Sequence, residues 1–143
     1  MNNEHGKVVT ALAYDEQGNL SLVDSISILP EDHSGPVQQS GIRITPNGKY
    51  IYSLIRAINS VAAIEIKEDG KLEQLQLLAL DCVSPKDCAV TPDGKFLWVA
   101  GKVSGAMLIY NIGADGKLDP NCKKIPLNNP ANIAFVENGK PCR

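Results

Sequence analysis

Cysteine and histidine are the residue types of this chain that most readily bind metals or act as nucleophiles, and their spacing decides what they can do. The cysteines form no CxxC pair, and no pair of histidines accompanies them. Neither a zinc site nor the disulfide framework of a secreted protein is therefore indicated. We expect free thiols and no metal site; the four cysteines are Cys82, Cys88, Cys122 and Cys142.

Proton transfer is another chemistry that single side chains supply, and the sequence offers few candidates for it. His33 lies in a loop with proline and glycine, where it is either an acid/base group or a solvated histidine. Asp87 follows a Ser-Pro-Lys segment and is either a general base or a partner in an ion pair or turn. His5 belongs to the N-terminal stretch and is given no role. His33 and Asp87 are thus the acid/base candidates.

The sequence segments that are expected to position these side chains occur more than once in the chain. Thr45-Pro46-Asn47-Gly48-Lys49 returns 46 residues later as Thr91-Pro92-Asp93-Gly94-Lys95. A second phrase, Asp69-Gly70-Lys71-Leu72, returns at the same interval as Asp115-Gly116-Lys117-Leu118, and weaker copies stand at 16–20 and 136–140. A period of roughly 40 to 50 residues with glycine turns and no helical pattern is typical of β-propellers.

Each repeat is predicted to be a four-stranded antiparallel meander with no helix longer than a turn or two. Some strands, such as 96–100, are apolar on both faces, which indicates a sheet covered on both sides. We therefore expect Ile64, Leu97, Trp98 and Ile109 to be buried between blades. The predicted strands are 42–45, 50–55, 61–67 and 72–80 in one blade and 88–91, 96–100, 106–112 and 118–124 in the next.

The predicted domain is a partial all-β propeller over residues 1–143. Residues 8–29 supply the outer hairpin of one blade, full blades span 42–80 and 88–124, and 132–136 is predicted to be the inner strand of another. Closed propellers have roughly 4 to 8 blades, and this chain has about three. We expect either the C-terminal portion of a longer protein, or closure by association with another chain or a second copy, most economically as a homodimer.

Composition excludes several other classes. The formal net charge is −2 and the basic residues are spread along the chain, so binding to nucleic acid is not expected. The N-terminal residues lack the apolar core of a signal peptide, and no stretch approaches the roughly 20 apolar residues of a membrane span. We expect a cytoplasmic protein that does not bind membranes.

The order of these phrases resembles the bacterial β-propeller 6-phosphogluconolactonases and the related carboxymuconate-lactonizing enzymes. The similar segments are 42–52 followed by Arg56, Pro85-Lys86 in place of a Pro-Arg pair, 91–96, Ala100-Gly101 and 129–135. The resemblance covers residues 8–136, nearly the whole chain. It implies a seven-bladed propeller whose N-terminal half is absent.

The resemblance also implies a reaction, which is hydrolysis of the lactone of a phosphorylated sugar in the pentose phosphate pathway, without a cofactor. Such hydrolysis needs a positioned water, a proton acceptor and donors at the carbonyl oxygen, and the phosphate calls for Arg or Lys. The substrate-binding residues that it implies are Arg56, Lys86 and Lys102. The alternatives are a bridge between blades for Arg56 and a solvated loop for Lys86.

Two functional classes stay open. Apolar residues flank Arg56 where the family has small or polar neighbours, and they favour a degenerate propeller that acts as an interaction scaffold; they are Leu54, Ile55, Ala57 and Ile58. The long match favours the C-terminal part of a lactone hydrolase. Because such a site is gathered from several blades, we expect little or no turnover from the isolated chain.

Overall fold

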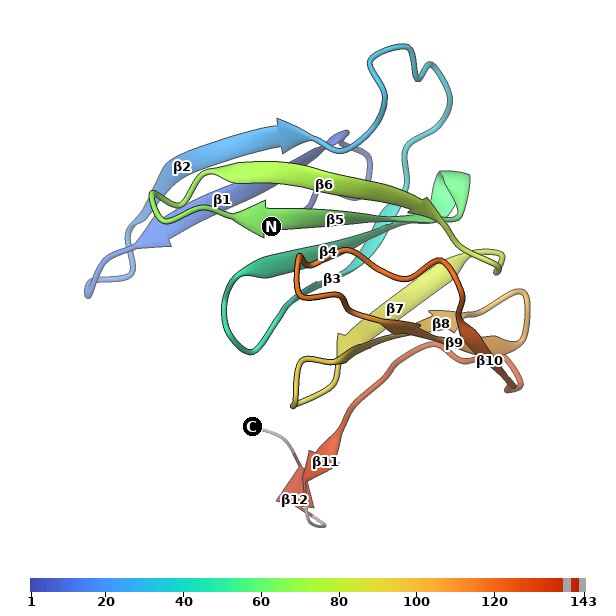
Figure 1. Ribbon diagram of the computed structural model, residues 1–143. Helices are drawn as coiled ribbons and strands as arrows, with labels where there is room; N and C mark the ends of the chain where they lie inside the picture. The colour runs from blue at the N-terminus through green and yellow to red at the C-terminus, as the bar shows by residue number, and fades with distance from the viewer. Residues whose placement is uncertain (138–139, 142–143) are drawn as a thin grey trace.

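The computed structural model describes residues 1–137 and 140–141, and this part of the chain forms a row of antiparallel sheets (Figure 1). The one helical element within it is the 3₁₀ turn η1 (Arg56–Ile58), so the all-β prediction is confirmed. None of the described helical structure is long and apolar enough to cross a membrane. Cys142 lies outside the described residues.

Two four-stranded antiparallel sheets form the centre of the row, and we call them blade A and blade B. In both, four strands that follow one another in the sequence are neighbours in the sheet, as the meander prediction requires. Blade A contains β3 (Gln39–Ile44), β4 (Tyr50–Ile55), β5 (Ser60–Ile66) and β6 (Leu72–Ala79). Blade B contains β7 (Pro85–Val90), β8 (Phe96–Gly101), β9 (Ala106–Asn111) and β10 (Lys123–Pro126).

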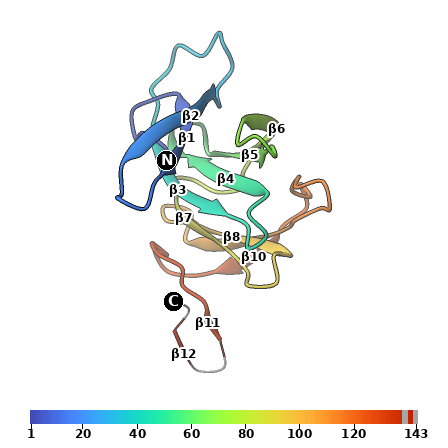
Figure 2. The ribbon, with the colours of Figure 1, turned by 90° about the vertical axis from the view of Figure 1, so that its left-hand side faces the viewer.

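The N-terminal hairpin, β1 (Val8–Tyr14) and β2 (Leu20–Ser27), lies on the opposite side of blade A from blade B (Figure 2). It is the predicted outer hairpin. At the other end of the row, the two-residue strands β11 (Val136–Glu137) and β12 (Lys140–Pro141) pair with each other. The sheets therefore stand side by side in sequence order, as successive blades of a propeller do.

The repeated glycine turns fold alike in the two blades. Thr45 Oγ1 donates a hydrogen bond to Asn47 Oδ1 (2.7 Å), and Thr91 Oγ1 donates to Asp93 Oδ1 (2.6 Å). Gly48 and Gly94 adopt φ values of 73° and 72°, a left-handed conformation that glycine takes without the steric cost of a Cβ. The 46-residue sequence repeat is therefore a repeat of turn geometry.

Blades A and B meet at an apolar boundary. The cluster there contains Tyr52, Leu54, Val61 and Ala63 of blade A and Leu97, Val99, Leu108 and Tyr110 of blade B, all buried. A second cluster, between the N-terminal hairpin and blade A, includes Val9, Ile28, Ile51, Ile55, Ala62 and Ile64. Blade A is thus covered on both faces, which explains strands that are apolar throughout.

Two of the four residues predicted to be buried between blades are not. Ile64 and Leu97 are fully buried, whereas Trp98 and Ile109 are only half-buried. They lie on the face of blade B that no further blade covers within the described residues, and only Phe135 packs edge-on against Trp98, at a centroid distance of 5.2 Å. Their equivalents 46 residues earlier, Tyr52 and Ala63, are buried because blade B covers them.

Two strand predictions also differ from the structure. The fourth strand of blade B, predicted at 118–124, makes a single bridge between Leu118 and Ile112, and β10 begins only at Lys123. Residues 132–135, predicted as an inner strand, have no regular secondary structure, and pairing begins at Val136. A strand needs a hydrogen-bonding neighbour, and this segment has no adjacent strand in the described part of the chain.

Candidate functional site

Arg56 stands directly after β4 and begins η1, which connects β4 to β5 within blade A. Its backbone N–H donates to Gln38 O (2.6 Å), and η1 ends at Asn59, which has φ 48°. The Asn59 side chain in turn accepts the Ser84 N–H (2.9 Å), which fixes this turn to the connection between the blades. The guanidinium is thus carried by a backbone that is held on both sides.

Lys86 occupies an irregular position on the inner strand of blade B. The pairing of β7 with β8 shifts register between Pro85 and Asp87, so Lys86 lies in a β-bulge. The inner strand of blade A has a shift of the same kind between Gln39 and Ile42. Bulges re-aim side chains and are frequent next to functional sites. Both inner strands are therefore distorted at the end of the blade where Arg56 stands.

Glu4 brings a carboxylate to the same place. Its Oε1 lies 2.6 Å from Arg56 Nη2, and its backbone oxygen accepts the Gln39 N–H at 2.8 Å. The Glu4 side chain is 59% exposed and that of Arg56 20% exposed. The Nε of Arg56 is buried and has no hydrogen-bond partner within the described residues. The pair therefore keeps one face open to solvent and one donor unused.

These residues line a cleft of about 300 Å³. Sequence reasoning predicted Arg56 and Lys86, and the structure brings both into this cleft. It adds one acid and three neutral polar residues, so the cleft offers two cations, one carboxylate and several hydrogen-bonding groups for an anionic ligand. The added residues are Asn2, Glu4, Gln39 and Ser40.

Glu4 is the residue that sequence reasoning missed, although a signal for it exists. It stands fourteen positions before Gly18, just as Arg56 stands fourteen before Gly70 and Lys102 fourteen before Gly116. The three are equivalent positions, each just before the third strand of a blade. Counting back from the glycine turn would therefore have placed Glu4 at the same blade position as Arg56 and Lys102, although only Glu4 and Arg56 meet in the cleft.

Lys102 and His33 do not line the cleft. Lys102 is exposed in the turn after β8, where its N–H donates to Ser84 O (3.2 Å). His33 is half-buried in the loop between β2 and β3, and its Nε2 lies 3.2 Å from Pro36 O. The structure thus leaves both of these candidates away from Arg56 and Lys86.

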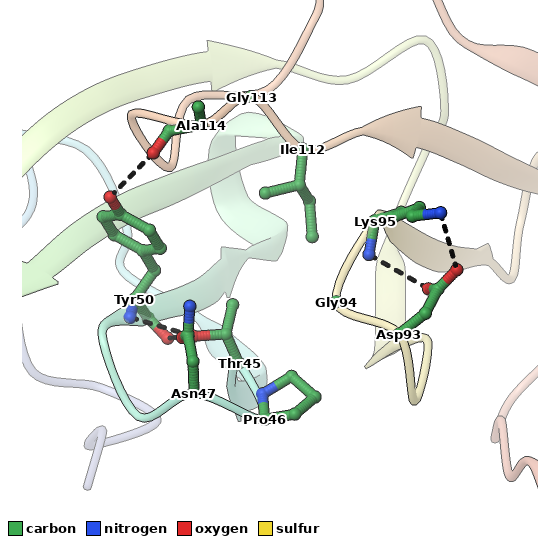
Figure 3. Close-up of a pocket in the computed structure, with 10 residues that line it drawn as sticks. All are labelled: Thr45, Pro46, Asn47, Tyr50, Asp93, Gly94, Lys95, Ile112, Gly113 and Ala114. Atoms are coloured by element: carbon green, nitrogen blue, oxygen red, sulfur yellow. Dashed lines mark hydrogen bonds and ion pairs between the residues drawn. The ribbon is translucent and has the colours of Figure 1, made fainter.

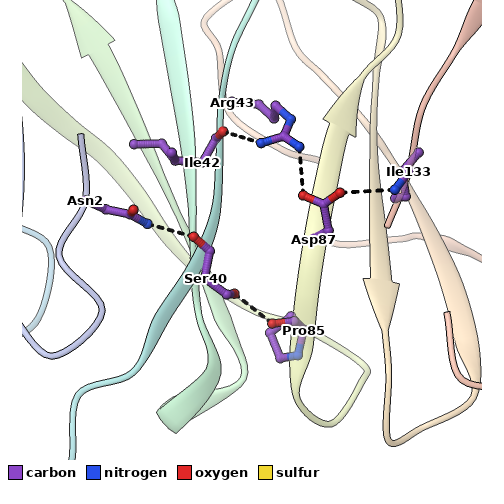
Figure 4. A network of polar contacts seen from close by, with 7 residues as sticks. All are labelled: Asn2, Ser40, Ile42, Arg43, Pro85, Asp87 and Ile133. Carbon is purple, nitrogen blue, oxygen red and sulfur yellow. Dashed lines mark hydrogen bonds and ion pairs between the residues drawn. The ribbon is translucent and has the colours of Figure 1, made fainter. Parts of the chain in front are cut away.

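Asp87 is buried and its carboxylate is occupied on both oxygens (Figure 4). Oδ1 accepts from Arg43 Nη2 (2.9 Å) and Oδ2 accepts from the Ile133 N–H (3.0 Å). These contacts tie together the inner strands β3 and β7 and the C-terminal segment. Gly41 allows the strands to approach, because a Cβ at this position would lie 3.0 Å from Cys88 N. In this arrangement Asp87 links neighbouring elements.

A second cleft, of about 290 Å³, lies at the opposite ends of the strands, among the glycine turns (Figure 3). Its acidic and amide groups are engaged within their own turns: Asp93 Oδ1 accepts from Thr91 Oγ1 and from the Lys95 N–H, and Asn47 Oδ1 accepts from Thr45 Oγ1. The hydrogen bond from Thr91 is the main cause that lowers the pKa of Asp93. These groups stabilise turns, so the cleft with Arg56 is the candidate site.

The thiols and acidic residues form no metal centre in the described part of the chain, where no three His, Cys, Asp or Glu side chains are placed to hold an ion. Cys82, Cys88 and Cys122 are free thiols. Burial raises the pKa of Cys82 to about 11 and that of Cys88 to about 12. Buried thiols of this kind are poor nucleophiles at neutral pH.

Comparisons with a family model and with curated proteins point to the same family. The model of the family described as "Lactonase, 7-bladed beta-propeller" matches residues 1–135. A 6-phosphogluconolactonase from Blochmanniella pennsylvanica is 32% identical over 115 residues, covering 79% of this chain and 34% of the relative. One from Klebsiella pneumoniae (strain 342) is 28% identical over 105 residues, covering 73% of this chain and 32% of the relative. The chain spans about a third of the length of the curated relatives it matches.

Solved structures show the same fold. A periplasmic gluconolactonase from Pseudomonas aeruginosa, PpgL, superposes with a TM-score of 0.87 at 19% identity, over 94% of this chain and 38% of the other. A putative 6-phosphogluconolactonase from Bacteroides uniformis superposes with a TM-score of 0.83 at 25% identity, over 93% of this chain and 38% of the other. The N-terminal hairpin and blades A and B thus have the arrangement of propeller blades in longer chains.

Proposed function

This chain belongs to the lactonase family of seven-bladed β-propellers, and we propose that its cleft is part of the substrate site of a hydrolase that opens 6-phosphogluconolactone. The observation that carries the proposal is the meeting of Glu4, Arg56 and Lys86 in one cleft, from three successive blade units. The names of the two curated relatives supply the substrate class.

The two cations suit the phosphate of such a substrate. Arg56 offers a planar guanidinium on a side chain that is 20% exposed, and a guanidinium binds phosphate through charge-assisted hydrogen bonds. Lys86 adds an exposed point charge from the bulge of β7. In this proposal Arg56 holds the phosphate or the lactone carbonyl, and Lys86 contributes the weaker contact.

Glu4 suits the proton transfer. Its Oε1 is engaged by Arg56, and its Oε2 has no hydrogen-bond partner within the described residues, which leaves it for a water molecule. A carboxylate in reach of such a water accepts its proton as the water attacks the lactone carbonyl. The Glu4–Arg56 pair would thus hold base and substrate-binding cation at a fixed separation.

The scaffold alternative was favoured by the apolar neighbours of Arg56. In the structure Ile55 is fully buried in the cluster beneath the N-terminal hairpin, and Ile58 packs against the same cluster. These side chains belong to the core and do not make the cleft apolar. The apolar neighbours of Arg56 therefore do not support a non-catalytic role.

The proposal is tested first by binding. We would titrate the chain with 6-phosphogluconate, the stable hydrolysis product, and with gluconate, following backbone amide signals by NMR. Loss of an Arg–phosphate contact costs roughly 1.5 to 3 kcal/mol, so Arg56→Ala should weaken 6-phosphogluconate binding about 10- to 100-fold, and Lys86→Ala less. Lys102→Ala is the matched control, because Lys102 is the equivalent position outside the cleft.

Turnover is tested in a chimera in which residues 1–135 replace the matching third of the Klebsiella pneumoniae enzyme. Arg56→Ala should reduce kcat/KM for the phosphorylated lactone more than for its unphosphorylated analogue. Equal losses would assign Arg56 to the carbonyl or to structure. A chain that binds neither acid, with a folded chimera unaffected by all three variants, would support the scaffold function instead.

A further inference from the structure

A buried polar pair lies beneath the cleft, and the fold does not require it. Gln39 is 2% exposed and Ser53 is fully buried, and Ser53 Oγ donates to Gln39 Oε1 (3.2 Å). At the equivalent positions 46 residues later, blade B has Pro85 and Val99, which are buried and apolar. Burying polar groups costs free energy unless they are hydrogen-bonded, and blade B packs without them.

The Gln39 side chain holds the N-terminal arm, residues 1–7. Its Nε2 donates to Gly6 O (2.6 Å) and to Val8 O (3.1 Å), while its backbone N–H donates to Glu4 O (2.8 Å). The Gln39 backbone therefore holds the arm at Glu4, and its side chain holds the arm at Gly6 and the start of β1 at Val8.

Ser53 holds the same arm nearer its start. Its Oγ accepts from Asn2 Nδ2 (3.2 Å), and that amide also donates to Ser40 O (2.9 Å; Figure 4). Glu4 thus lies between two anchored positions, Asn2 and Gly6. Its carboxylate is exposed and long enough to adopt many rotamers, so the position of its backbone decides whether it meets Arg56.

We propose that Gln39, supported by Ser53, is the positioning residue of this site: its amide sets the place of Glu4 opposite Arg56. This inference rests on the proposed function for its biological meaning. Gln39 acts through Glu4 and is not itself a catalytic residue. The polar pair is present at the boundary that carries the Glu4–Arg56 pair and is replaced by apolar residues at the boundary between blades A and B.

The test reads the Glu4–Arg56 pair directly, without a ligand. In 15N NMR, a guanidinium held in an ion pair rotates slowly and gives resolved Nη signals for Arg56, and Glu4→Gln serves as the reference in which the pair is lost. We expect the double variant Gln39→Leu/Ser53→Val, which copies the apolar character of blade B, to lose these signals as Glu4→Gln does. Thr45→Val, which removes a buried polar side chain just beyond the far end of β3, should keep them.

Removing both partners leaves neither side chain unsatisfied, and the carbonyls of Gly6 and Val8, which lose their Gln39 donor, belong to residues that are only half-buried, so the double variant is expected to fold. Should it not fold, Asn2→Ala releases the arm from a half-buried position, and we expect it to weaken the Arg56 signals partially. Resolved Arg56 signals in the folded double variant, or signals as strong as those of the unmodified chain in Asn2→Ala if only that variant folds, would overturn the proposal.

Binding of 6-phosphogluconate separates this inference from the proposed function. If the unmodified chain binds the acid, the double variant should bind it about 10-fold more weakly, by analogy with the loss of one hydrogen bond to a charged group. If the unmodified chain does not bind it, the proposed function fails, while the Arg56 signals still decide whether Gln39 positions Glu4.

Discussion

The two blade boundaries of this chain use the same backbone repeat and differ in the side chains that they bury. Between blades A and B the core is apolar, with Pro85 and Val99 at positions where the hairpin boundary has Gln39 and Ser53. The hairpin boundary carries the cleft with Glu4 and Arg56, and its polar pair is fully hydrogen-bonded. Both boundaries thus pack on apolar residues; the A–B boundary buries Asp87, which links its inner strands, and the hairpin boundary buries Gln39 and Ser53, which hold the segment that carries Glu4.

The largest expected effect is self-association through the two outer faces of the row, which are the faces of the N-terminal hairpin and of blade B that are turned away from blade A. Leu12, Tyr14, Leu20 and Leu22 are exposed on the N-terminal hairpin, and Trp98 and Ile109 are half-buried on blade B. Exposed apolar faces and unpaired strand edges drive association. We expect the 143-residue chain to self-associate in sedimentation velocity, and Leu20→Lys/Leu22→Lys to shift it toward monomer. A monodisperse monomer at high concentration would contradict this expectation.

Within the A–B boundary, Leu97→Ala should be the most destabilising of the substitutions considered. Leu97 is fully buried, and truncating a buried leucine to alanine costs about 2–5 kcal/mol through lost contacts and a cavity. Urea unfolding measures this loss. Folded Leu97→Ala protein should keep the Arg56 signals, whereas Gln39→Leu/Ser53→Val should lose them at a smaller cost in stability. Loss of the Arg56 signals in both would erase the distinction between the boundaries.

The Arg43–Asp87 pair connects the inner strands of the two blades, and its members should respond unequally. The Arg43 side chain is 42% exposed and that of Asp87 10% exposed. Arg43→Met leaves a buried carboxylate with only the Ile133 N–H, so we expect a loss of about 2–3 kcal/mol; Asp87→Asn leaves an arginine that reaches water and should cost about 1 kcal/mol. Urea unfolding at pH 7 distinguishes the two, and equal losses would count against this account.

The smallest effect is a pH dependence at the A–B boundary. Burial raises the pKa of the Cys88 thiol from 9.0 to about 12, so above pH 9 the unfolded chain ionises while the folded chain does not. Stability should then fall as pH rises above 9, by about 1 kcal/mol for this group between pH 9 and 10. Cys88→Ala should flatten the decline measured by urea unfolding between pH 9 and 10, before tyrosines ionise. An unchanged slope would show that Cys88 does not contribute.

Repetition in the sequence was enough to predict the blades. The glycine turns recur at a fixed interval because each turn has the same local requirement, a threonine that bonds across the turn and a glycine at positive φ. The apolar strands between them predicted sheets covered on both faces, and blade A is covered by the N-terminal hairpin on one face and by blade B on the other. Arg56 and Lys86 were identified through the resemblance to the lactonase family, which rests on the phrases around them.

Other features depend on tertiary structure and could not be predicted from the repeated phrases. Trp98 and Ile109 are apolar residues of the kind that is usually buried. Their burial depends on whether another blade covers them, and no local sequence pattern records whether it does. Glu4 reaches Arg56 across 52 positions of sequence because the N-terminal arm folds back on blade A, held by Gln39 and Asn2. The conformation of a glycine turn is determined by neighbouring residues and can be predicted from them. The site instead depends on hydrogen bonds between segments that meet only when the blades pack.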